Sequence, residues 1–510
     1  MLDWNFRDLS VHGVDRPPAN HQEGSDMATD DQDPKQQGPD MEGFASTTGR
    51  GPKTPIELRR EERGPSPQGP LAGAAPPTGG YAAADHGAAP LPLAEYTPQA
   101  PRSIEETRLS PSFLAELLVK VLYFGGDMDG AKIADYACLP FAAVVYPLLT
   151  ELKTDRIVEI KGGTTQYSAS WRFALTKYGS EKAQEVMSRN QYVGPAPVGL
   201  SDYVQMVHRQ FTAQGVTFDD VRHAFRDLVV PDDLVEKVGS AVNSSKSIFL
   251  YGPPGNGKTS VAERIVRMMR GAIYVPHAIE ASGQIIKIHD PLDHHPPEGM
   301  KPPSTYDKRW VLCKRPMIIV GGELTLRMLD LIYNDVEKFY EAPFQIKSNG
   351  GMLLIDDFGR QLVHPKDLLN RWIVPLEKGL DYLTLHTGQK FEAPFRQLVV
   401  FSTNMNPKDL VDEAFLRRLR YKIEISDPSE QNYRAIIRRT CDSKGVAWAE
   451  EGISYLIKEH YKKDNVPLRA CHPRDLVEII LDKARFMRCA PTLDPHFIDM
   501  AWNAYFVRYT

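Results

Sequence analysis

Long apolar stretches are absent from this 510-residue chain, and cysteine is scarce. No uninterrupted apolar run approaches the roughly 18 residues that a membrane helix needs, and no short apolar run opens the chain as a secretory leader would. The five cysteines are scattered without a C-x-x-C pair, which argues against a disulfide scaffold and a cysteine-rich zinc site. We therefore expect reduced thiols, no membrane span and a cytoplasmic location.

An excess of positive charge is also missing. The formal net charge is −5, so no general basic field is available to hold nucleic acid, although a local basic patch remains compatible with this total. Residues 1–104 are rich in Pro, Gly, Ala, Asp and Gln and have few periodic apolar positions. Such a segment buries too little surface to offset chain entropy, so we predict a disordered tail.

Residues 105–190 predict a small domain of helices followed by a hairpin. The expected helices cover 111–122, 130–136 and 141–153, the strands 157–160 and 166–175, and a last helix starts at Ser180. Pro147 should kink the third helix. This order resembles a winged-helix domain. Residues 141–146 offer no Arg, Lys, Asn or Gln to a base edge, and ten basic side chains face eleven acidic ones across the domain. Protein docking is therefore favoured, with DNA binding as the alternative.

The rest of the chain divides into three parts. A Pro/Gly-rich stretch, 191–204, is predicted as a linker. Strand-like and helical patterns alternate over 205–425, as in an α/β domain whose parallel sheet lies between helices. Residues 426–510 are predicted as a mostly helical domain, because apolar residues recur there at helical spacing.

The most informative motif lies between a strand-like run and a helical pattern. It fits G-x-x-x-x-G-K-[ST] without a mismatch and comprises Gly252, Pro253, Pro254, Gly255, Asn256, Gly257, Lys258 and Thr259, with Ser260 next in the chain. In this setting, backbone N–H groups and the helix N-terminus hold phosphates, the lysine reaches them, and the threonine hydroxyl ligates Mg²⁺. The loop predicts binding of a nucleoside triphosphate.

Two further apolar runs end in polar residues suited to the same site. Residues 352–355 end in Asp356 and Asp357, and residues 398–401 lead to Asn404. Wholly apolar strands are typical of buried parallel sheets, and ligands gather at their carboxyl ends. Asp356 is thus placed for Mg²⁺, and Asp357 to orient and activate a water. The Asn404 amide could hold that water in line.

These motifs stand in the order found in AAA+ ATPases. Residues 414–420 look like the arginine-finger segment of that family, and residues 471–476 look like the sensor 2 segment that opens a helical lid. The resemblance covers roughly 205–510. It implies an α/β AAA+ P-loop NTPase core with an α-helical lid, ATP hydrolysis, and Mg²⁺ as cofactor.

The resemblance also implies roles for individual residues. Asn404 becomes sensor 1, and Arg474 becomes the sensor 2 residue that contacts the γ-phosphate from the lid. Arg418 best matches the finger that reaches the ATP of a neighbouring subunit, with Arg417 and Arg420 as alternatives. An arginine stabilises the charge on the transferring phosphoryl oxygens. A finger that acts between subunits implies a homo-oligomeric ring, most often a hexamer.

Residues 380–391 alternate around a Thr-Gly turn and predict a hairpin. Its position looks like that of the pre-sensor-1 hairpin in the clade that holds MoxR-like chaperones, where such hairpins commonly face the pore and touch the client. A plain edge hairpin is the alternative. By this resemblance we expect a machine that remodels or assembles a protein client of unidentified nature.

Two departures from the family pattern leave other functions open. The catalytic acid is usually Glu, and Asp357 is one methylene shorter, so a slow nucleotide-gated switch is an alternative. An Asp-Asp pair also occurs in replication initiators, which keeps a DNA-associated ATPase open. The segment 281–349 exceeds the needs of the core and is expected to be an insertion specific to a client or partner. Its His/Asp cluster, 288–297, could bind a metal, but packing of a Pro-rich loop is favoured.

Overall fold

The computed structural model describes residues 96–162, 168–211, 215–410 and 416–506. Most of the predicted disordered tail, 1–95, lies outside the described residues. The last part of the predicted tail differs from expectation, because residues 96–104 pack against the insertion. The N–H of Ala100 donates to Thr305 O, and the N–H of Asp307 donates to Pro98 O. The tail prediction therefore extended too far along the chain.

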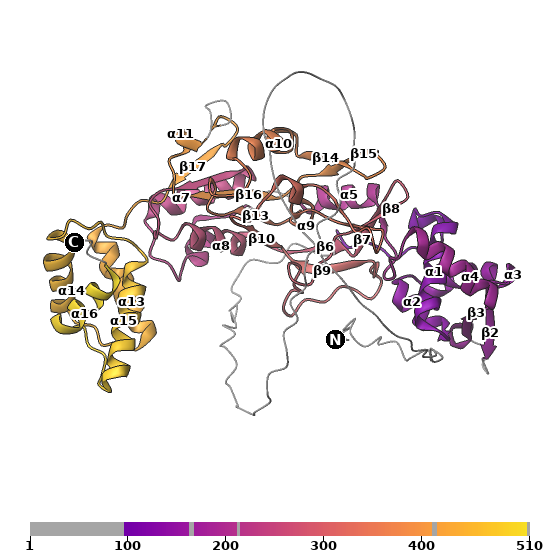
Figure 1. Ribbon diagram of the computed structural model, residues 1–510, viewed down its shortest axis with the longest axis horizontal. Coiled ribbons are helices and arrows are strands. Elements are labelled where there is room, and N and C mark those ends of the chain that lie inside the picture. The colour runs from indigo at the N-terminus through magenta and orange to yellow at the C-terminus, as the bar shows by residue number, and fades with distance from the viewer. Residues whose placement is uncertain (1–95, 163–167, 212–214, 411–415, 507–510) are drawn as a thin grey trace, which may run out of the picture. The chain divides into compact units, whose positions relative to one another are not determined.

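The first domain combines helices with a three-stranded antiparallel sheet in the order β1-β3-β2 (Figure 1). Its elements are η2 Glu105–Thr107, α1 Pro111–Gly125, β1 Met128–Asp129, α2 Gly130–Ala137, η3 Phe141–Val145, α3 Tyr146–Thr154, β2 Val158–Gly162, η4 Ser168–Ser170, β3 Arg172–Leu175 and α4 Lys177–Arg189. Side chains of Ser110, Asp129 and Thr176 cap α1, α2 and α4. The predicted hairpin turn at residues 163–165 lies outside the described residues.

Three details of this domain differ from the sequence prediction. The helix expected from Ser180 begins at Lys177, because the Thr176 hydroxyl accepts from Gly179 N–H and sets its start. The helix containing Pro147 divides into a π-helical turn, η3, and the α-helix α3, which accommodates the missing proline N–H. Strand β1 was not predicted, because two residues carry no readable alternation.

The central sheet has five parallel strands in the order β10-β13-β16-β5-β17. These are β10 Met317–Val320, β13 Met352–Ile355, β16 Leu398–Thr403, β5 Ile248–Tyr251 and β17 Tyr421–Glu424. One apolar cluster joins the sheet to α6 Phe218–Ala224, α7 Asp232–Ser244 and α8 Lys258–Met268, and a second joins it to α10 Pro365–Lys378. Helices thus cover both faces, which confirms the α/β fold class with a parallel sheet between helices.

Strands from residues 278–341, together with β4 from before the central sheet, build a second sheet in the order β11-β12-β8-β7-β4. Strands β6 and β9 form a separate antiparallel pair (Figure 1). The bounds are β4 Val198–Gly199, β6 Ala272–Pro276, β7 Ala278–Ala281, β8 Gln284–Lys287, β9 Trp310–Lys314, β11 Ile332–Tyr333 and β12 Tyr340–Glu341. The prediction that 281–349 lies outside the core is therefore wrong in part, since β10 within this segment is the edge strand of the central sheet. The predicted linker, 191–204, contains β4 and the start of α5 Leu200–Gln210.

The C-terminal region is helical, as predicted. It comprises α13 Glu430–Lys444, α14 Glu450–Tyr455, η6 Leu456–Lys462, α15 His472–Met487 and α16 Pro495–Tyr505. Their buried apolar faces form one cluster around Tyr433, Ile437, Ile480 and Trp502. The remaining short helices are η5 Leu326–Leu329, α9 Phe344–Lys347 and α11 Pro407–Leu410, and strands β14 Leu380–Thr384 and β15 Lys390–Pro394 form the predicted hairpin. Within the described ranges no single helix is long and apolar enough to cross a membrane; α2 and η3–α3 reach that length only as a pair bent by 99°.

Candidate functional site

The glycine-rich loop connects strand β5 to helix α8, and its backbone angles require glycine at Gly252 and Gly257 among others. Gly252 has φ +137°, and a Cβ at this position would lie 2.3 Å from Ile425 O, just beyond β17. Gly257 has φ +79° and stands at the N-cap of α8. Only glycine adopts such angles without strain. The loop therefore runs close against β17 before it enters the helix, as a phosphate-binding loop requires.

Lys258 lies within this loop and is 6% exposed. Its Nζ donates to Gly252 O at 3.0 Å and to Pro253 O at 2.8 Å. Burial lowers the pKa of Lys258, the carboxylates of Asp356 and Asp357 act in the opposite direction, and the positive charge of Arg469 adds to the lowering. The ammonium group is thus bonded to neutral carbonyls in a site with a second cation nearby.

The structure brings the predicted acids to the end of the loop. Thr259 Oγ1 donates to Asp356 Oδ2 at 2.8 Å, and Asn404 Nδ2 donates to Asp357 Oδ1 at 3.1 Å. Asp357 is exposed and has φ +48°, an angle that Asp tolerates better than most residues. Its own N–H donates to Asp356 Oδ1 at 3.0 Å. A hydroxyl, two carboxylates and an amide therefore lie together where β13 and β16 end and α8 begins.

Strand order explains this convergence. Strand β16 lies between β5 and β13, so Asn404 comes out between the phosphate loop and the acid pair. The turn after β13 is tied to β16, because the N–H of Phe358 donates to Ser402 O at 2.7 Å and Thr403 Oγ1 donates to Phe358 O at 2.6 Å. The carboxyl ends of parallel strands share one sheet edge, which is where such folds bind ligands.

The oxygen donors also suit the implied metal. Mg²⁺ prefers carboxylate and hydroxyl oxygens, and Thr259 and Asp356 present these 2.8 Å apart beside the loop. The residues present therefore fit the pattern in which a hydroxyl and an acid hold a magnesium ion together with substrate phosphates.

Residues 469–471, of which only Cys471 belongs to the predicted sensor 2 segment, meet the loop. Arg469 Nη1 donates to Pro254 O, and Cys471 N–H donates to Gly255 O at 2.8 Å. The side chain of Asn256 accepts from Ala470 N–H at 3.1 Å. The predicted lid residue Arg474 is not brought to the loop. It is 66% exposed in its side chain and pairs with Asp475 at 3.0 Å.

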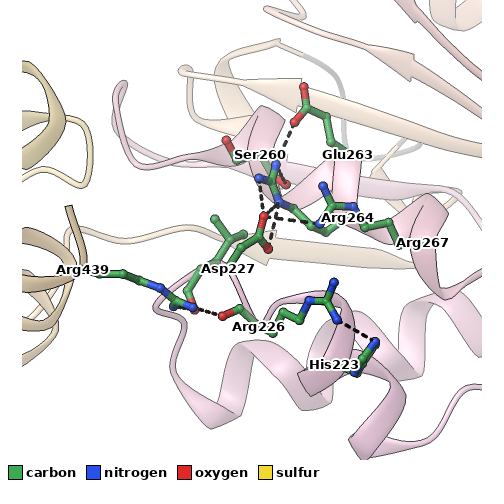
Figure 2. A network of polar contacts seen from close by, with 9 residues as sticks. His223, Arg226, Asp227, Ser260, Glu263, Arg264, Arg267 and Arg439 are labelled. Atoms are coloured by element: carbon green, nitrogen blue, oxygen red, sulfur yellow. Dashed lines mark hydrogen bonds and ion pairs between the residues drawn. The ribbon is translucent and has the colours of Figure 1, made fainter. Parts of the chain in front are cut away.

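A second contact joins the C-terminal region to the core on the outer side of α8 (Figure 2). Asp227 accepts hydrogen bonds from Arg264 and pairs with Arg267. Arg439 of α13 donates to the carbonyl oxygens of Arg226 and Leu228. Burial opposes ionisation of Asp227, but the hydrogen bonds and charge of Arg264 outweigh it and lower its pKa. The turn 226–228 is therefore held from both sides, by α8 and by α13.

The three candidate finger arginines follow residues 411–415, which lie outside the described residues. Arg418 is half-buried and pairs through Nε with Glu377 of α10, whereas Arg417 and Arg420 are exposed. The pair involves a carboxylate whose side chain is 46% exposed, so its contribution is about 0–1 kcal/mol.

The predicted hairpin is formed by β14 and β15, with Thr384 paired to Lys390 next to the tip. Asp381 of β14 is 1% exposed, and Arg371 of α10 donates to both of its oxygens, at 2.6 and 3.1 Å. The His386 N–H donates to Tyr340 OH at 2.8 Å. The hairpin is thus fastened to α10 and to the second sheet, while residues 386–390 at its tip are exposed.

The predicted His/Asp cluster is organised by ring contacts, edge-on between His277 and His289 and stacked between His289 and His294. His289 lies 5.3 Å from His277 and 5.5 Å from His294, measured between ring centroids. His294 Nε2 is bonded to Lys347 O, and its Nδ1 accepts from Asp290 N–H. In the part of the chain that the structure describes, no group of three or more potential ligands is arranged to hold a metal ion. These contacts agree with the favoured packing role.

Comparison with known proteins gives partial matches. A family described as "Domain of unknown function (DUF8689)" matches residues 429–504, within the helical C-terminal region. The vesicle-fusing ATPase of Dictyostelium discoideum is 28% identical over 232 residues, covering 43% of this chain and 24% of that protein. The vesicular-fusion protein sec18 of Schizosaccharomyces pombe is 26% identical over 219 residues, covering 42% and 22%. The chain thus spans about a quarter of the length of these curated relatives.

Solved structures resemble the chain only weakly. The RuvB Holliday junction branch migration motor of Thermotoga maritima has a TM-score of 0.33 and 13% identity, covering 55% of this chain and 70% of that chain. NtrX from Brucella abortus in complex with ATP has a TM-score of 0.35 and 12% identity, covering 55% of each chain. TM-scores this low do not establish that the folds are the same. The curated relatives support the AAA+ ATPase superfamily, whereas the MoxR-like placement and the winged-helix resemblance stay predictions.

Proposed function

We propose that this protein is an AAA+ ATPase that uses ATP hydrolysis to remodel or assemble a protein client. The observation that carries the proposal is the contact of Thr259 with Asp356 beside that of Asn404 with Asp357, at the end of a glycine-rich loop. Phosphate cradle, metal-binding oxygens and a candidate base lie together there. Phosphoryl transfer needs positioning and charge stabilisation of this kind.

Each residue of the site then has a distinct task. Lys258 and the loop N–H groups bind and orient the phosphates, and Asp357 accepts a proton from the attacking water. The Asn404 amide holds the Asp357 carboxylate and that water in position. Thr259 and Asp356 would hold Mg²⁺, which would supply charge neutralisation on the phosphates when bound.

The finer proposal is a MoxR-like machine that works as a homo-oligomeric ring, with a hexamer as the expected form. Its support is the β14–β15 hairpin, which lies between the acid pair and β16 in the chain and exposes its tip. The 105–190 domain is proposed as a docking module of winged-helix type. Its sheet order and helices agree with that type, and Ala142 and Pro147 are exposed in the first part of its third helix.

Lys258→Ala tests the nucleotide site. We expect ATP affinity to fall by about tenfold or more, since a hydrogen bond to a charged group contributes about 1.5–3 kcal/mol. Lys246→Ala, on an exposed lysine two residues before β5, is the control. Equal affinity and turnover in Lys258→Ala would contradict the assignment.

The client is tested with Asp357→Asn, which we expect to bind ATP and stall. Proteins that co-purify with this variant in ATP but not in ADP are candidate clients. Nuclease-sensitive nucleic acid held in their place would favour the alternative of a DNA-associated ATPase. Neither kind of partner, together with slow turnover in the wild type, would favour the nucleotide-gated switch.

A further inference from the structure

The clasp, defined as residues Arg469, Ala470 and Cys471, touches the phosphate loop at three consecutive positions. It meets Pro254 and Gly255 through their carbonyl oxygens, and Asn256 through its side chain. Gly255 has φ +80°, and a Cβ there would lie 2.5 Å from Cys471 Sγ. The loop and the clasp are therefore in close contact, and a shift of one displaces the other.

The side chain of Asn256 connects the phosphate loop to the clasp. The residue is 7% exposed, and both ends of its amide are used. Its Nδ2 donates to Asp427 Oδ1 at 2.7 Å, and its Oδ1 accepts from Ala470 N–H at 3.1 Å. Asp427 stands between β17 and α13, where the chain leaves the central sheet for the helical region. The buried side chain of Asn256 thus links the loop to the connection into the lid, at Asp427, and to the clasp within the lid, at Ala470.

The charges of the site favour an anion between Arg469 and Lys258. Arg469 Nη1 and Lys258 Nζ donate to neutral carbonyl oxygens of adjacent loop residues, Pro254 and Pro253. Among the described residues Arg469 forms no ion pair. A guanidinium binds phosphate more strongly than it binds a neutral carbonyl oxygen, because both partners are charged and the pair is frequently bidentate. A polyphosphate at the loop would therefore draw Arg469 away from Pro254.

Arg474 lacks these properties. Its Nε and Nη2 atoms both lie 3.0 Å from Asp475 Oδ1, so a carboxylate already engages its guanidinium. Asp475 is itself fixed by Tyr505 OH at 2.9 Å. Arg474 makes this pair away from the loop, whereas Arg469 already donates to Pro254 O within it.

We propose that Arg469, rather than Arg474, is the lid arginine that contacts the phosphates of bound nucleotide, and that Asn256 transmits loop occupancy to the lid. The proposal rests on the proposed function and assigns a residue to it. Arg469 is a binding residue that favours the nucleotide with more phosphate charge. Asn256 is a positioning residue that acts through Ala470 and Asp427.

The first test is equilibrium binding of a non-hydrolysable ATP analogue to the full chain. We expect Arg469→Ala to weaken binding by about tenfold, from the strength of a charged hydrogen bond, and Arg469→Lys to restore part of it. Arg474→Ala should have the smaller effect, and Arg485→Ala, on an 81%-exposed arginine of α15, is the matched control. Equal effects of Arg469→Ala and Arg474→Ala, or a larger effect of the latter, would overturn the proposal.

The second test needs no nucleotide. Hydrogen exchange at the Ala470 and Cys471 amides should be slow in the wild type and faster in Asn256→Ala, and polyphosphate alone should change it in the wild type. Exchange that is the same in both proteins would show that Asn256 does not couple the loop to the clasp. A wild type that binds no ATP analogue would defeat the proposed function itself, whereas a wild type that binds it while Arg469→Ala binds equally well defeats only the assignment of Arg469.

Discussion

The carboxylate of Asp357 is held by Asn404 at 3.1 Å and projects from a residue with φ +48°. It is one methylene shorter than the glutamate usual in the family, which sets the base back by about 1 Å, and misplacement of that size can cost about 100-fold in rate. We expect Asp357→Glu to raise turnover several-fold and Asp357→Asn to abolish it, both with unchanged ATP affinity. The measurement is steady-state ATP hydrolysis beside analogue binding. Slower hydrolysis in Asp357→Glu would mean that the loop is fitted to aspartate.

A second prediction at this scale concerns the pKa values of His277 and His289, whose rings are in contact. Burial lowers the pKa of His277 to about 4 and that of His289 to about 3, where the charges of His277, His294 and Lys287 also lower it and Asp290 raises it. Unfolded histidine has a pKa near 6.5, so the unfolded chain binds more protons below that value. Stability should therefore fall as pH drops from about 6.5 towards 4, by up to about 3 kcal/mol per histidine.

Denaturant unfolding at a series of pH values measures this effect. His289→Leu should flatten the acid slope, and His295→Leu, on an exposed histidine of the same loop, should leave it in place. An unchanged slope in His289→Leu would show that other groups govern the acid sensitivity.

The site residues also show which positions a sequence motif predicts and which it does not. The loop, Asp356, Asp357 and Asn404 were predictable, because each lies at the end of a strand whose apolar run is readable. Arg469 was not, since a motif supplies the order of residues along the chain and not which of two arginines around the start of a helix faces a loop more than 200 residues away. The deciding contacts, from Pro254 to Arg469, exist only in the folded chain.

At the scale of elements, the hairpin depends on one buried ion pair. Asp381 of β14 accepts from Arg371 of α10, and Gln345 Nε2 donates to it at 3.2 Å. Removing one member of a buried pair costs about 3–5 kcal/mol; Arg371 is 25% exposed and keeps a second ion pair, with Asp330 at 3.3 Å, which places this pair at the lower end. We expect Asp381→Ala to destabilise the protein by about 3 kcal/mol and to speed hydrogen exchange over 380–394. Glu392→Ala, on an exposed position of β15, is the control, and an equally stable Asp381→Ala protein would contradict the account.

Elements were predictable where their pattern was long. Helices α1 and α8, the strands of the central sheet around the acid pair, and the hairpin all carry clear periodicity. Strand β4 was read as linker, because Val198 and Gly199 pair with β7 far along the chain and carry no pattern of their own. Strand β10 was assigned to the insertion, because nothing local distinguishes an edge strand of the central sheet from the strands of the second sheet.

At the scale of the whole molecule, the lid is joined to the core at two separate places. The clasp and Asn256 hold the loop end of α8, and Arg439 holds the turn 226–228, which Asp227 fixes to the side of the same helix (Figure 2). Helix α8 therefore lies between both connections. A change at the phosphate loop would reach the C-terminal helices through either route, which suits a protein in which nucleotide state controls the position of a lid.

The last prediction concerns the assembly. Arg418 is half-buried and pairs through Nε with Glu377 of its own chain. We expect Arg418→Ala to keep ATP affinity and lose turnover, because its guanidinium would complete the site of a neighbouring subunit. Mixing this variant with wild type should lower activity more steeply than the fraction of variant added. Glu377→Ala is the matched control, since it breaks the same pair and keeps the arginine. Activities that simply add on mixing, or a loss of turnover confined to Arg417→Ala or Arg420→Ala, would remove Arg418 from this role.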